Sequence, residues 1–376
     1  MTSKLDRVDY HALDKAKNAF IEAGKKTLGF AKKYGFIPGG KFGASANVFS
    51  LDLKKYFKKK HNRLFVTLLP EGLGTADDAR PDDLSPIELV KFWHNIGIKT
   101  VAVMTNDAAA TGMQTVLISL YLPSSNPELV FNEQFMKGFL GGFVEGCKRV
   151  GCVYFSGETP QLKTKIIENR IDIAGALFGV MPPGIKPIDS GEIKAGDYIV
   201  FVESSGPHEN GFTTLRHLAE KLPEGYRTKL PSGKEYWEGM NAPSMLYTPF
   251  VQSVLAAGLH PTNIEPITGH GWQKLMRPKK NFAYVIERTL PIPEIFEFFE
   301  EKSGMSKQEM ISTFNYGVGY AVFMKSEKDA KRVVEIAHKN KLQAVVAGRV
   351  ENSNKREVIV NPFNVVLDGG NFALTK

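Results

Sequence analysis

The chain has 376 residues, and at about 100–200 residues per domain this length indicates two domains. Hydrophobic residues make up 43% and charged residues 23%, which argues against a fibrous or disordered protein. The formal net charge is +8, so the composition favours anionic ligands such as phosphates, nucleotides or RNA without choosing among them.

The sequence predicts a cytoplasmic protein without membrane contact. No apolar run approaches the roughly 18 residues that span a bilayer, and the N-terminal stretch has charges where a signal peptide needs an apolar core. Cys147 and Cys152 are the two cysteines, too few for a zinc site by themselves. The basic run at 54–63 has no interleaved aromatic signature, so we expect a solvated turn and no nucleic-acid partner.

Apolar spacing predicts alternating helices and strands in the first half. Helices are expected at 11–33, from Ser85 onward and at 132–150, and strands at 64–69, 114–122, 152–155 and 171–181. A separate helical or strand segment is expected to carry Asn106 and Asp107. Four glycines interrupt the helix at 132–150, and each costs a helix up to about 1 kcal/mol. They predict close approach to another backbone, as in tight helix–sheet packing.

Residues 182–187 have the composition of a linker, so we place a boundary between a domain at 1–182 and a domain at 183–376. In the second half, strands are predicted at 198–203, 282–287, 320–324 and 342–350, and helices at 212–221, 244–257, 294–301 and 327–339. The alternation favours an α/β (α+β) fold in which each domain is a mixed sheet with helices packed on it.

Three carboxylates follow apolar strands or lie in loops, where active-site residues are common: Glu71, Asp107 and Glu158. If they converge, a hard cation must lie between them, and oxygen ligands without His or Cys favour magnesium over zinc. The alternative is that each one caps a helix or accepts a backbone N–H.

Three loops have the composition of phosphate-binding loops. They are the glycine loop at 39–43, the S-S-G-P-H-E-N-G loop at 204–211, and the T-G-H-G loop at 268–271. His208, in the second loop, could also transfer a proton near neutral pH. Ordinary caps and turns would explain the same residues.

Together these segments resemble the aminoimidazole ribonucleotide synthetase (phosphoribosylformylglycinamidine cyclo-ligase) family over roughly residues 35–350. The resemblance rests on GFVEGCKRVGC followed by SGET, and on DIAGALFGV, IKAGDYIVFVESSGPHENG, ITGHG, PIPEIF and EMISTFNYGVG. Relatives of this family include formylglycinamidine ribonucleotide synthetase, selenophosphate synthetase, thiamin-monophosphate kinase and a hydrogenase maturation factor. The later motifs indicate the cyclo-ligase branch.

The resemblance implies an N-terminal ATP-binding and dimerisation domain, whose sheets pair across a homodimer, and a C-terminal domain of the synthetase family. It implies ATP and Mg²⁺, a ribonucleotide substrate, and conversion of formylglycinamidine ribonucleotide to aminoimidazole ribonucleotide in purine biosynthesis, with release of ADP and phosphate. The alternatives are another ATP-using enzyme of the superfamily and a non-catalytic nucleotide-binding homologue.

Motif by motif, the resemblance assigns roles to individual residues. The residues implied in catalysis are His208, Asp107 and Asn210, and those implied in metal binding are Glu71, Asp107 and Glu158. ATP binding falls to Gly39, Gly40, Lys41, Gly43, Gly72, Gly74, Thr75, Asn106 and Glu158. Substrate phosphate binding falls to Ser204, Ser205, Thr268, Gly269 and Gly271.

The sequence departs from the family's D-G-x-G-T-K motif, which reads E-G-L-G-T-A here. Glu71 replaces the aspartate and is one methylene longer, which could shift a metal. Ala76 replaces the lysine, so a cationic phosphate contact is missing, and Lys41 is the candidate to restore the charge. In the S-G-x-H-S-N-G loop, Glu209 replaces the second serine.

Overall fold

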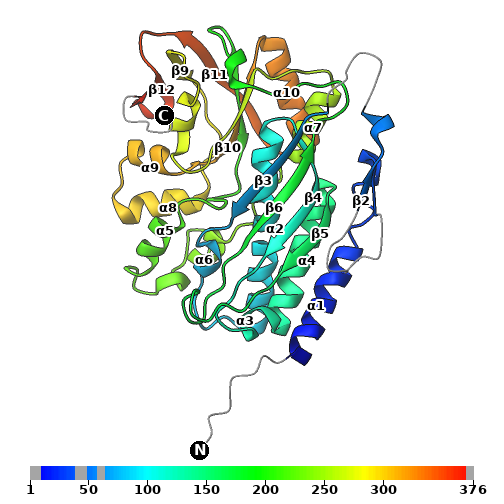
Figure 1. Cartoon of the computed structure of the whole chain (residues 1–376). Helices are drawn as coiled ribbons and strands as arrows, with labels where there is room; N and C mark the ends of the chain where they lie inside the picture. Colours follow the sequence, from blue (N-terminus) through cyan, green and yellow to red (C-terminus); the bar gives the residue numbers. More distant parts are fainter. Residues whose placement is uncertain (1–9, 39–48, 57–63, 370–376) are drawn as a thin grey trace, which may run out of the picture.

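The computed structural model describes residues 10–38, 49–56 and 64–369, and its strands form two large sheets and one small hairpin. The four-stranded sheet has the order β3-β6-β4-β5, made of β3 (Val66–Gly72), β6 (Ala174–Val180), β4 (Gln114–Tyr121) and β5 (Val153–Glu158). This half also contains helix α1 (Tyr10–Lys25), the short helix α3 (Glu128–Phe131) and a hairpin of β1 (Phe36–Pro38) with β2 (Phe49–Leu51) (Figure 1).

The seven-stranded sheet belongs to the second half and has the order β13-β12-β9-β11-β7-β10-β8. Its strands are β7 (Tyr198–Glu203), β8 (Asn263–Pro266), β9 (Phe282–Ile286), β10 (Val318–Met324), β11 (Ala344–Asn352), β12 (Glu357–Val360) and β13 (Val365–Asp368). Its helices are α5 (Phe212–Ala219), α6 (Tyr236–Met240), α7 (Thr248–Ala256), α8 (Glu294–Ser303), α9 (Lys307–Thr313) and α10 (Glu327–Lys339). The predicted α/β class with mixed sheets is confirmed, whereas the boundary at 182/183 stays a prediction.

Strand β7 shows how side-chain alternation divides the second half into two hydrophobic clusters. Ile199 and Phe201 contribute to the cluster that also contains residues of α5, α6 and α8, and Val200 and Val202 to the cluster of α7 and α10. All four of these side chains are fully buried. Because successive side chains point to opposite faces of a strand, one apolar run fills both layers.

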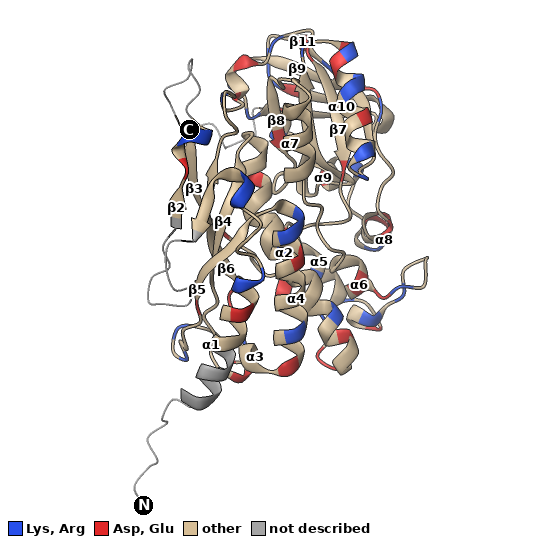
Figure 2. Ribbon diagram, turned by 90° about the vertical axis from the view of Figure 1, so that its right-hand side faces the viewer, with Lys and Arg blue, Asp and Glu red and all other residues tan. Residues whose placement is uncertain are grey.

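Helices α2 (Pro86–Ala110) and α4 (Glu133–Val150) lie side by side on one face of the four-stranded sheet (Figures 1 and 2). Ser85 begins α2 with a capping box, in which its hydroxyl accepts from Glu88 N and Glu88 accepts from Ser85 N. The helix then runs without interruption through Asn106 and Asp107, so the separate segment expected there is wrong. The predicted glycine-rich helix is confirmed as α4.

The glycines of α4 bring its backbone against α2, not against the sheet as predicted. A Cβ at Gly142 would lie 1.8 Å from the carbonyl oxygen of His94, and a Cβ at Gly138 would lie 2.5 Å from that of Val90. From the other side, a Cβ at Gly97 would lie 2.3 Å from the carbonyl oxygen of Phe139. The two helix backbones are therefore in direct contact, and glycine is required at the crossing.

Two of the element ends that differ from the predictions change the contacts around the four-stranded sheet. Helix α1 ends at Lys25, before the predicted residue 33, and Thr27 leaves the helix to accept a hydrogen bond from Tyr154 N at 2.8 Å. Strand β5 continues through the S-G-E sequence that was expected to be a loop, because Glu158 pairs with Tyr121 of β4. No helix in the described ranges is long and apolar enough to cross a membrane.

The glycine contact generates a stability prediction. We expect Gly142→Ala to destabilise the protein by about 1–3 kcal/mol or more, because the added methyl group must push α2 and α4 apart. Gly141→Ala, one residue earlier, is the matched control: its Cβ would have ordinary contact at 3.6 Å with the His94 side chain. The control should be neutral or stabilising by up to about 1 kcal/mol. Urea unfolding checks both, and equal free energies of unfolding for the two variants would contradict the contact.

Candidate active site

A cavity of about 90 Å³ lies where the first half meets the second. Its walls come from the end of β3, from α2, from the 204–211 loop and from β8 and β10. Its polar lining includes Glu71, Asp107, His208, Glu209, Asn210 and Thr268. The structure thus brings together the E-G-L-G-T, N-D, S-S-G-P-H-E-N-G and T-G-H-G motifs that are far apart in the sequence.

Glu71 and Asp107 are the predicted metal ligands that share this cavity. Burial raises the pKa of both carboxyl groups, and the Asp107 charge raises that of Glu71 further. The Lys274 charge opposes the shift at both residues. Two carboxylates that resist ionisation together are suited to a cation, because a bound cation removes their repulsion.

Glu158, the third predicted metal ligand, lies on the opposite face of the sheet. The strand register places one row of paired residues across the sheet: Gly72, Ala174, Tyr121 and Glu158. Glu71 belongs to the next row. Adjacent rows of a sheet point to opposite faces. Glu158 is exposed and does not line the cavity, so the three carboxylates do not converge within one chain, and the metal role of Glu158 stays a prediction. In the described ranges no group of three His, Cys, Asp or Glu could hold a metal.

His208 is part of the internal structure of its loop. The residue is 4% exposed and has a φ of 55°, and its Nε2 accepts hydrogen bonds from Ser205 N at 3.3 Å and Met245 N at 3.4 Å. Burial, and then the Lys99 charge, lowers the pKa of His208 to about 3. The ring is therefore neutral at physiological pH, and this environment does not support the predicted proton transfer near neutrality.

Lys99 of α2 binds the same loop through its side chain. Its side chain is fully buried, and Nζ donates to the carbonyl oxygen of His208 at 2.6 Å and to Ser244 Oγ at 3.5 Å. Burial lowers the pKa of Lys99 and raises that of Glu209, while the attraction between the two charges opposes both shifts. Glu209, the departure from the family's loop, is thus matched by a buried cation.

Asparagine side chains make the other connections around the cavity. Asn106 donates to the carbonyl oxygen of Met245 at 2.9 Å and accepts from Tyr247 N at 3.0 Å, so both ends of its amide are used to join the halves. Asn210 accepts from Gly269 N at 3.1 Å and thereby ties the second phosphate loop to the third. The two residues of the N-D motif therefore have different roles: Asn106 joins the halves, and Asp107 faces the cavity.

Several predicted ligand-binding residues do not line this cavity. Ser204 Oγ donates to Asn315 Oδ1 at 2.8 Å and Ser205 Oγ to the carbonyl oxygen of Pro243 at 2.7 Å. Gly271 packs against the α9 backbone, where a Cβ would lie 2.1 Å from the Ile311 carbonyl oxygen. Gly72, Gly74, Thr75, Gly269 and Gly271 are absent from its lining. Gly39, Gly40, Lys41 and Gly43 lie outside the described residues.

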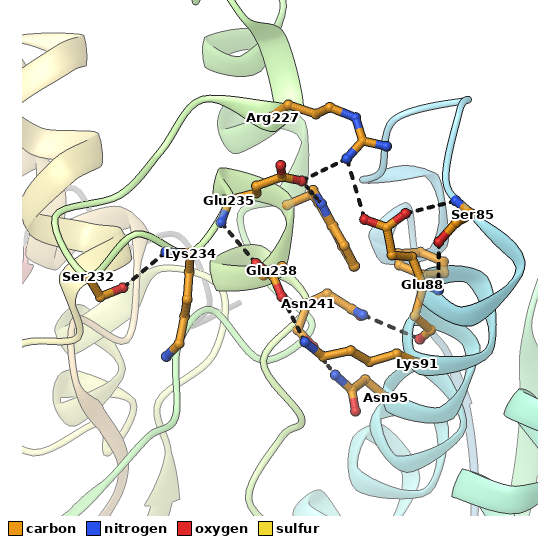
Figure 3. Close-up of polar contacts among 12 residues, drawn as sticks. Ser85, Glu88, Lys91, Asn95, Arg227, Ser232, Lys234, Glu235, Glu238 and Asn241 are labelled. Carbon is orange, nitrogen blue, oxygen red and sulfur yellow. Dashed lines mark hydrogen bonds and ion pairs between the residues drawn. The ribbon is translucent and has the colours of Figure 1, made fainter.

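Ser205 lines a second cavity, of about 410 Å³, between α2 and residues 234–243. Figure 3 shows the polar contacts in this region: Lys91, which lines the cavity, reaches Glu238 at 2.7 Å, and Arg227, outside the lining, lies between Glu88 at 3.4 Å and Glu235 at 3.0 Å. Asn95 donates to the Asn241 carbonyl oxygen at 3.0 Å. These contacts connect the two halves at this second place.

Comparisons with known proteins identify the family. The family model "AIR synthase related protein, N-terminal domain" matches residues 84–181. A phosphoribosylformylglycinamidine cyclo-ligase of Methanocaldococcus jannaschii is 30% identical over 292 residues, covering 77% of this chain and 79% of that protein. The chain belongs to the phosphoribosylformylglycinamidine cyclo-ligase family. The predicted resemblance is confirmed, and with it the assignment to a family of ATP-dependent ligases.

Solved structures show the same fold at low sequence identity. The hydrogenase maturation protein HypE in complex with ATP superimposes with a TM-score of 0.62 at 12% identity, covering 96% of this chain and 95% of that one. Thiamine-monophosphate kinase from Stenotrophomonas maltophilia has a TM-score of 0.59 at 14% identity, with coverages of 92% and 97%. The cyclo-ligase family member described here therefore has the architecture expected from its motifs.

The departures from the cyclo-ligase motif have a structural explanation in part. Ala76 is 2% exposed and belongs to the main hydrophobic cluster, so the methyl side chain fills a core position. A lysine there would have to bury its ammonium group or displace the turn at Ala76–Asp78. Sequence reasoning missed Lys99, whose charge acts on Glu209, and Lys274, whose charge acts on Glu71 and Asp107, because neither belongs to one of the quoted motifs.

The buried ring of His208 generates a second prediction. Nitrogen NMR of the imidazole should show one neutral tautomer, with the proton on Nδ1, throughout pH 5–8, because Nε2 accepts two backbone hydrogen bonds. The same protein unfolded in urea is the control and should titrate near the ordinary value of about 6.5. A protonation midpoint between pH 5 and 8 in the folded protein would restore His208 as a proton carrier.

Proposed function

We propose that this protein is an ATP-dependent cyclo-ligase that converts formylglycinamidine ribonucleotide to aminoimidazole ribonucleotide, with release of ADP and phosphate, in purine biosynthesis. The observation that carries the proposal is that one cavity gathers Glu71, Asp107, Asn210 and Thr268 from four separate motifs of a cyclo-ligase family member. The cytoplasmic location stays a prediction that agrees with this pathway.

The cavity fits the phosphate end of ATP with Mg²⁺. Magnesium is commonly held by one or two carboxylates, with substrate phosphates and water completing its shell, so Glu71 and Asp107 suffice without a third protein ligand. The donor set has oxygen atoms and no thiolate, which suits a hard cation. Bound there, Mg²⁺ would offset the negative charge of the phosphates.

The reaction requires the protein mainly to position its two substrates. The formyl oxygen of the ribonucleotide attacks the γ-phosphate of ATP and ADP leaves; an amidine nitrogen then closes the five-membered ring and expels phosphate. Phosphoryl transfer of this kind depends on alignment and charge stabilisation more than on covalent help from the protein. Asn210 and Lys99, which brace the 204–211 loop, are suited to that positioning.

Phosphate release tests the function. With Mg²⁺, ATP and formylglycinamidine ribonucleotide, the wild-type protein should release phosphate and form the imidazole product, and omission of the ribonucleotide should abolish release. Turnover with a different amide, and none with this ribonucleotide, would assign the protein to another reaction of the superfamily. Nucleotide binding without turnover of any substrate would support the non-catalytic alternative.

Asp107→Asn sharpens the same assay. The substitution keeps the size of the side chain and removes its charge, so turnover should fall by about 100-fold or more, equivalent to about 2.7 kcal/mol in the activation free energy. Asp82→Asn, in the exposed loop before α2, is the matched control and should retain wild-type turnover. Wild-type turnover and an unchanged magnesium requirement in Asp107→Asn would remove Asp107 from the site.

We also propose a homodimer formed through the uncovered part of the four-stranded sheet. Helices α2 and α4 cover one face of this sheet (Figure 2). On the other face the β1–β2 hairpin region packs over Leu117 and Phe178, whereas Leu68 is 73%, Val66 49% and Tyr121 43% exposed. Apolar side chains gathered on one sheet face favour a protein partner over water. A second copy of this chain would cover them, and Glu158 would then lie at the interface.

Light scattering tests the dimer. The wild type should give about twice 41.7 kDa at micromolar concentration. Leu68→Glu should shift the protein toward monomer, because it places a charge on the face that the dimer would bury. Ile87→Glu is the control: Ile87 is 84% exposed but lies at the start of α2, away from the sheet face. A monomeric wild type, or equal effects of the two variants, would count against this interface.

A further inference from the structure

Lys274 places an ammonium group next to a residue that lines the candidate active site. It lies in the 3₁₀ helix Gly271–Met276, directly after the T-G-H-G loop, and is 7% exposed. Its Nζ donates a hydrogen bond to the hydroxyl of Thr268, which itself lines the cavity. The side chain is therefore buried directly behind Thr268, with its ammonium group one hydrogen bond away from the cavity lining.

The charge of Lys274 has no direct counter-ion among the residues that the structure describes. Arg277, one turn further on, takes the nearby carboxylate, with its guanidinium 3.0 Å from Glu265. No described carboxylate lies within the 4.0 Å of Lys274 that would define an ion pair, although the charge acts on Glu71 and Asp107 through space. A buried cation without an ion-pair partner is costly, and an anionic ligand in the cavity would offset that cost.

The turn at Ala76 explains why a cation is needed from elsewhere. Ala76 is enclosed in the hydrophobic cluster, so the position that carries lysine in the family motif supplies no charge here. Lys99 is committed to the His208 carbonyl oxygen and lies beside Glu209. Among the residues in the described ranges, Lys274 is thus the cation left available at the Thr268 side of the cavity.

We propose that Lys274 contacts a phosphate group of the bound ligand, in the role that the motif lysine cannot fill from position 76. The inference rests on the proposed function, since both place ligand phosphates in the same cavity. The phosphate belongs to ATP or to the ribonucleotide substrate, because either one would bring phosphate oxygens to Thr268 and Lys274.

Binding measurements on Lys274→Met and Lys274→Arg test the contact. Calorimetric titrations with ATP, ADP, AMP and adenosine in the presence of Mg²⁺, and separately with formylglycinamidine ribonucleotide, locate the phosphate involved. Lys274→Met should weaken binding of the phosphate-bearing ligand by about tenfold or more, because it removes a charge-assisted hydrogen bond. Lys274→Arg keeps the charge and should recover most of the affinity, which a merely structural role would not require.

The pattern of losses identifies the source of the phosphate. Weaker binding of ATP and ADP with unchanged adenosine indicates the nucleotide, and weaker binding of the ribonucleotide alone indicates the substrate. Lys91→Met is the control: it removes an exposed lysine paired with Glu238 outside this cavity and should leave both affinities unchanged.

Three results would overturn the inference. The first is wild-type affinity for every ligand in a folded Lys274→Met. The second is a loss of affinity that is as large for adenosine as for ATP and as large in Lys274→Arg as in Lys274→Met, which would indicate a packing role. The third is a wild-type protein that binds neither ATP nor the ribonucleotide, and that result would remove the proposed function as well. Unfolding midpoints measured for each variant separate loss of the contact from loss of the fold.

Discussion

The structure depends on helix α2 being packed on both sides. On one side its backbone touches α4 at positions where only hydrogen atoms fit, at Gly138 and Gly142. On the other side its polar residues bind the second half: Lys99 reaches the His208 carbonyl oxygen, and Asn106 bonds the backbone of Met245 and Tyr247. Neither side tolerates much displacement, so the position of α2 determines where the two sheets lie relative to each other.

The candidate active site follows from that constraint. Asp107 is one residue beyond the asparagine that joins the halves, so its carboxylate is delivered to the junction by the same helical turn. Glu71 arrives from the end of β3 on the helix-covered face of the sheet. The loops that carry Asn210 and Thr268 come from the second half and are tied together by one hydrogen bond. The site is thus assembled at a joint and belongs to neither half alone.

The sequence predicts most elements well where apolar periodicity is strong, as in α4, α10 and β7. It also identifies the motifs that line the cavity, but it leaves open whether they converge. It fails where the answer depends on the third dimension. The alternation of β5 places Glu158 on the face away from Glu71, which a loop assignment for S-G-E concealed. The neutral state of His208 depends on backbone N–H groups of Ser205 and Met245, and no spacing rule reveals them.

The hydrogen bonds of Asn106 have a consequence for how ligands enter. Many two-part enzymes admit substrate by swinging their halves apart about a hinge. Here such a swing would break the two hydrogen bonds of the Asn106 amide, at a net cost of about 0.5–1.5 kcal/mol for each once water replaces the lost partner. These bonds therefore favour the closed arrangement of the two halves. Movement of loops at the mouth of the cavity would leave both bonds intact and keep Asp107 and Thr268 at the same spacing.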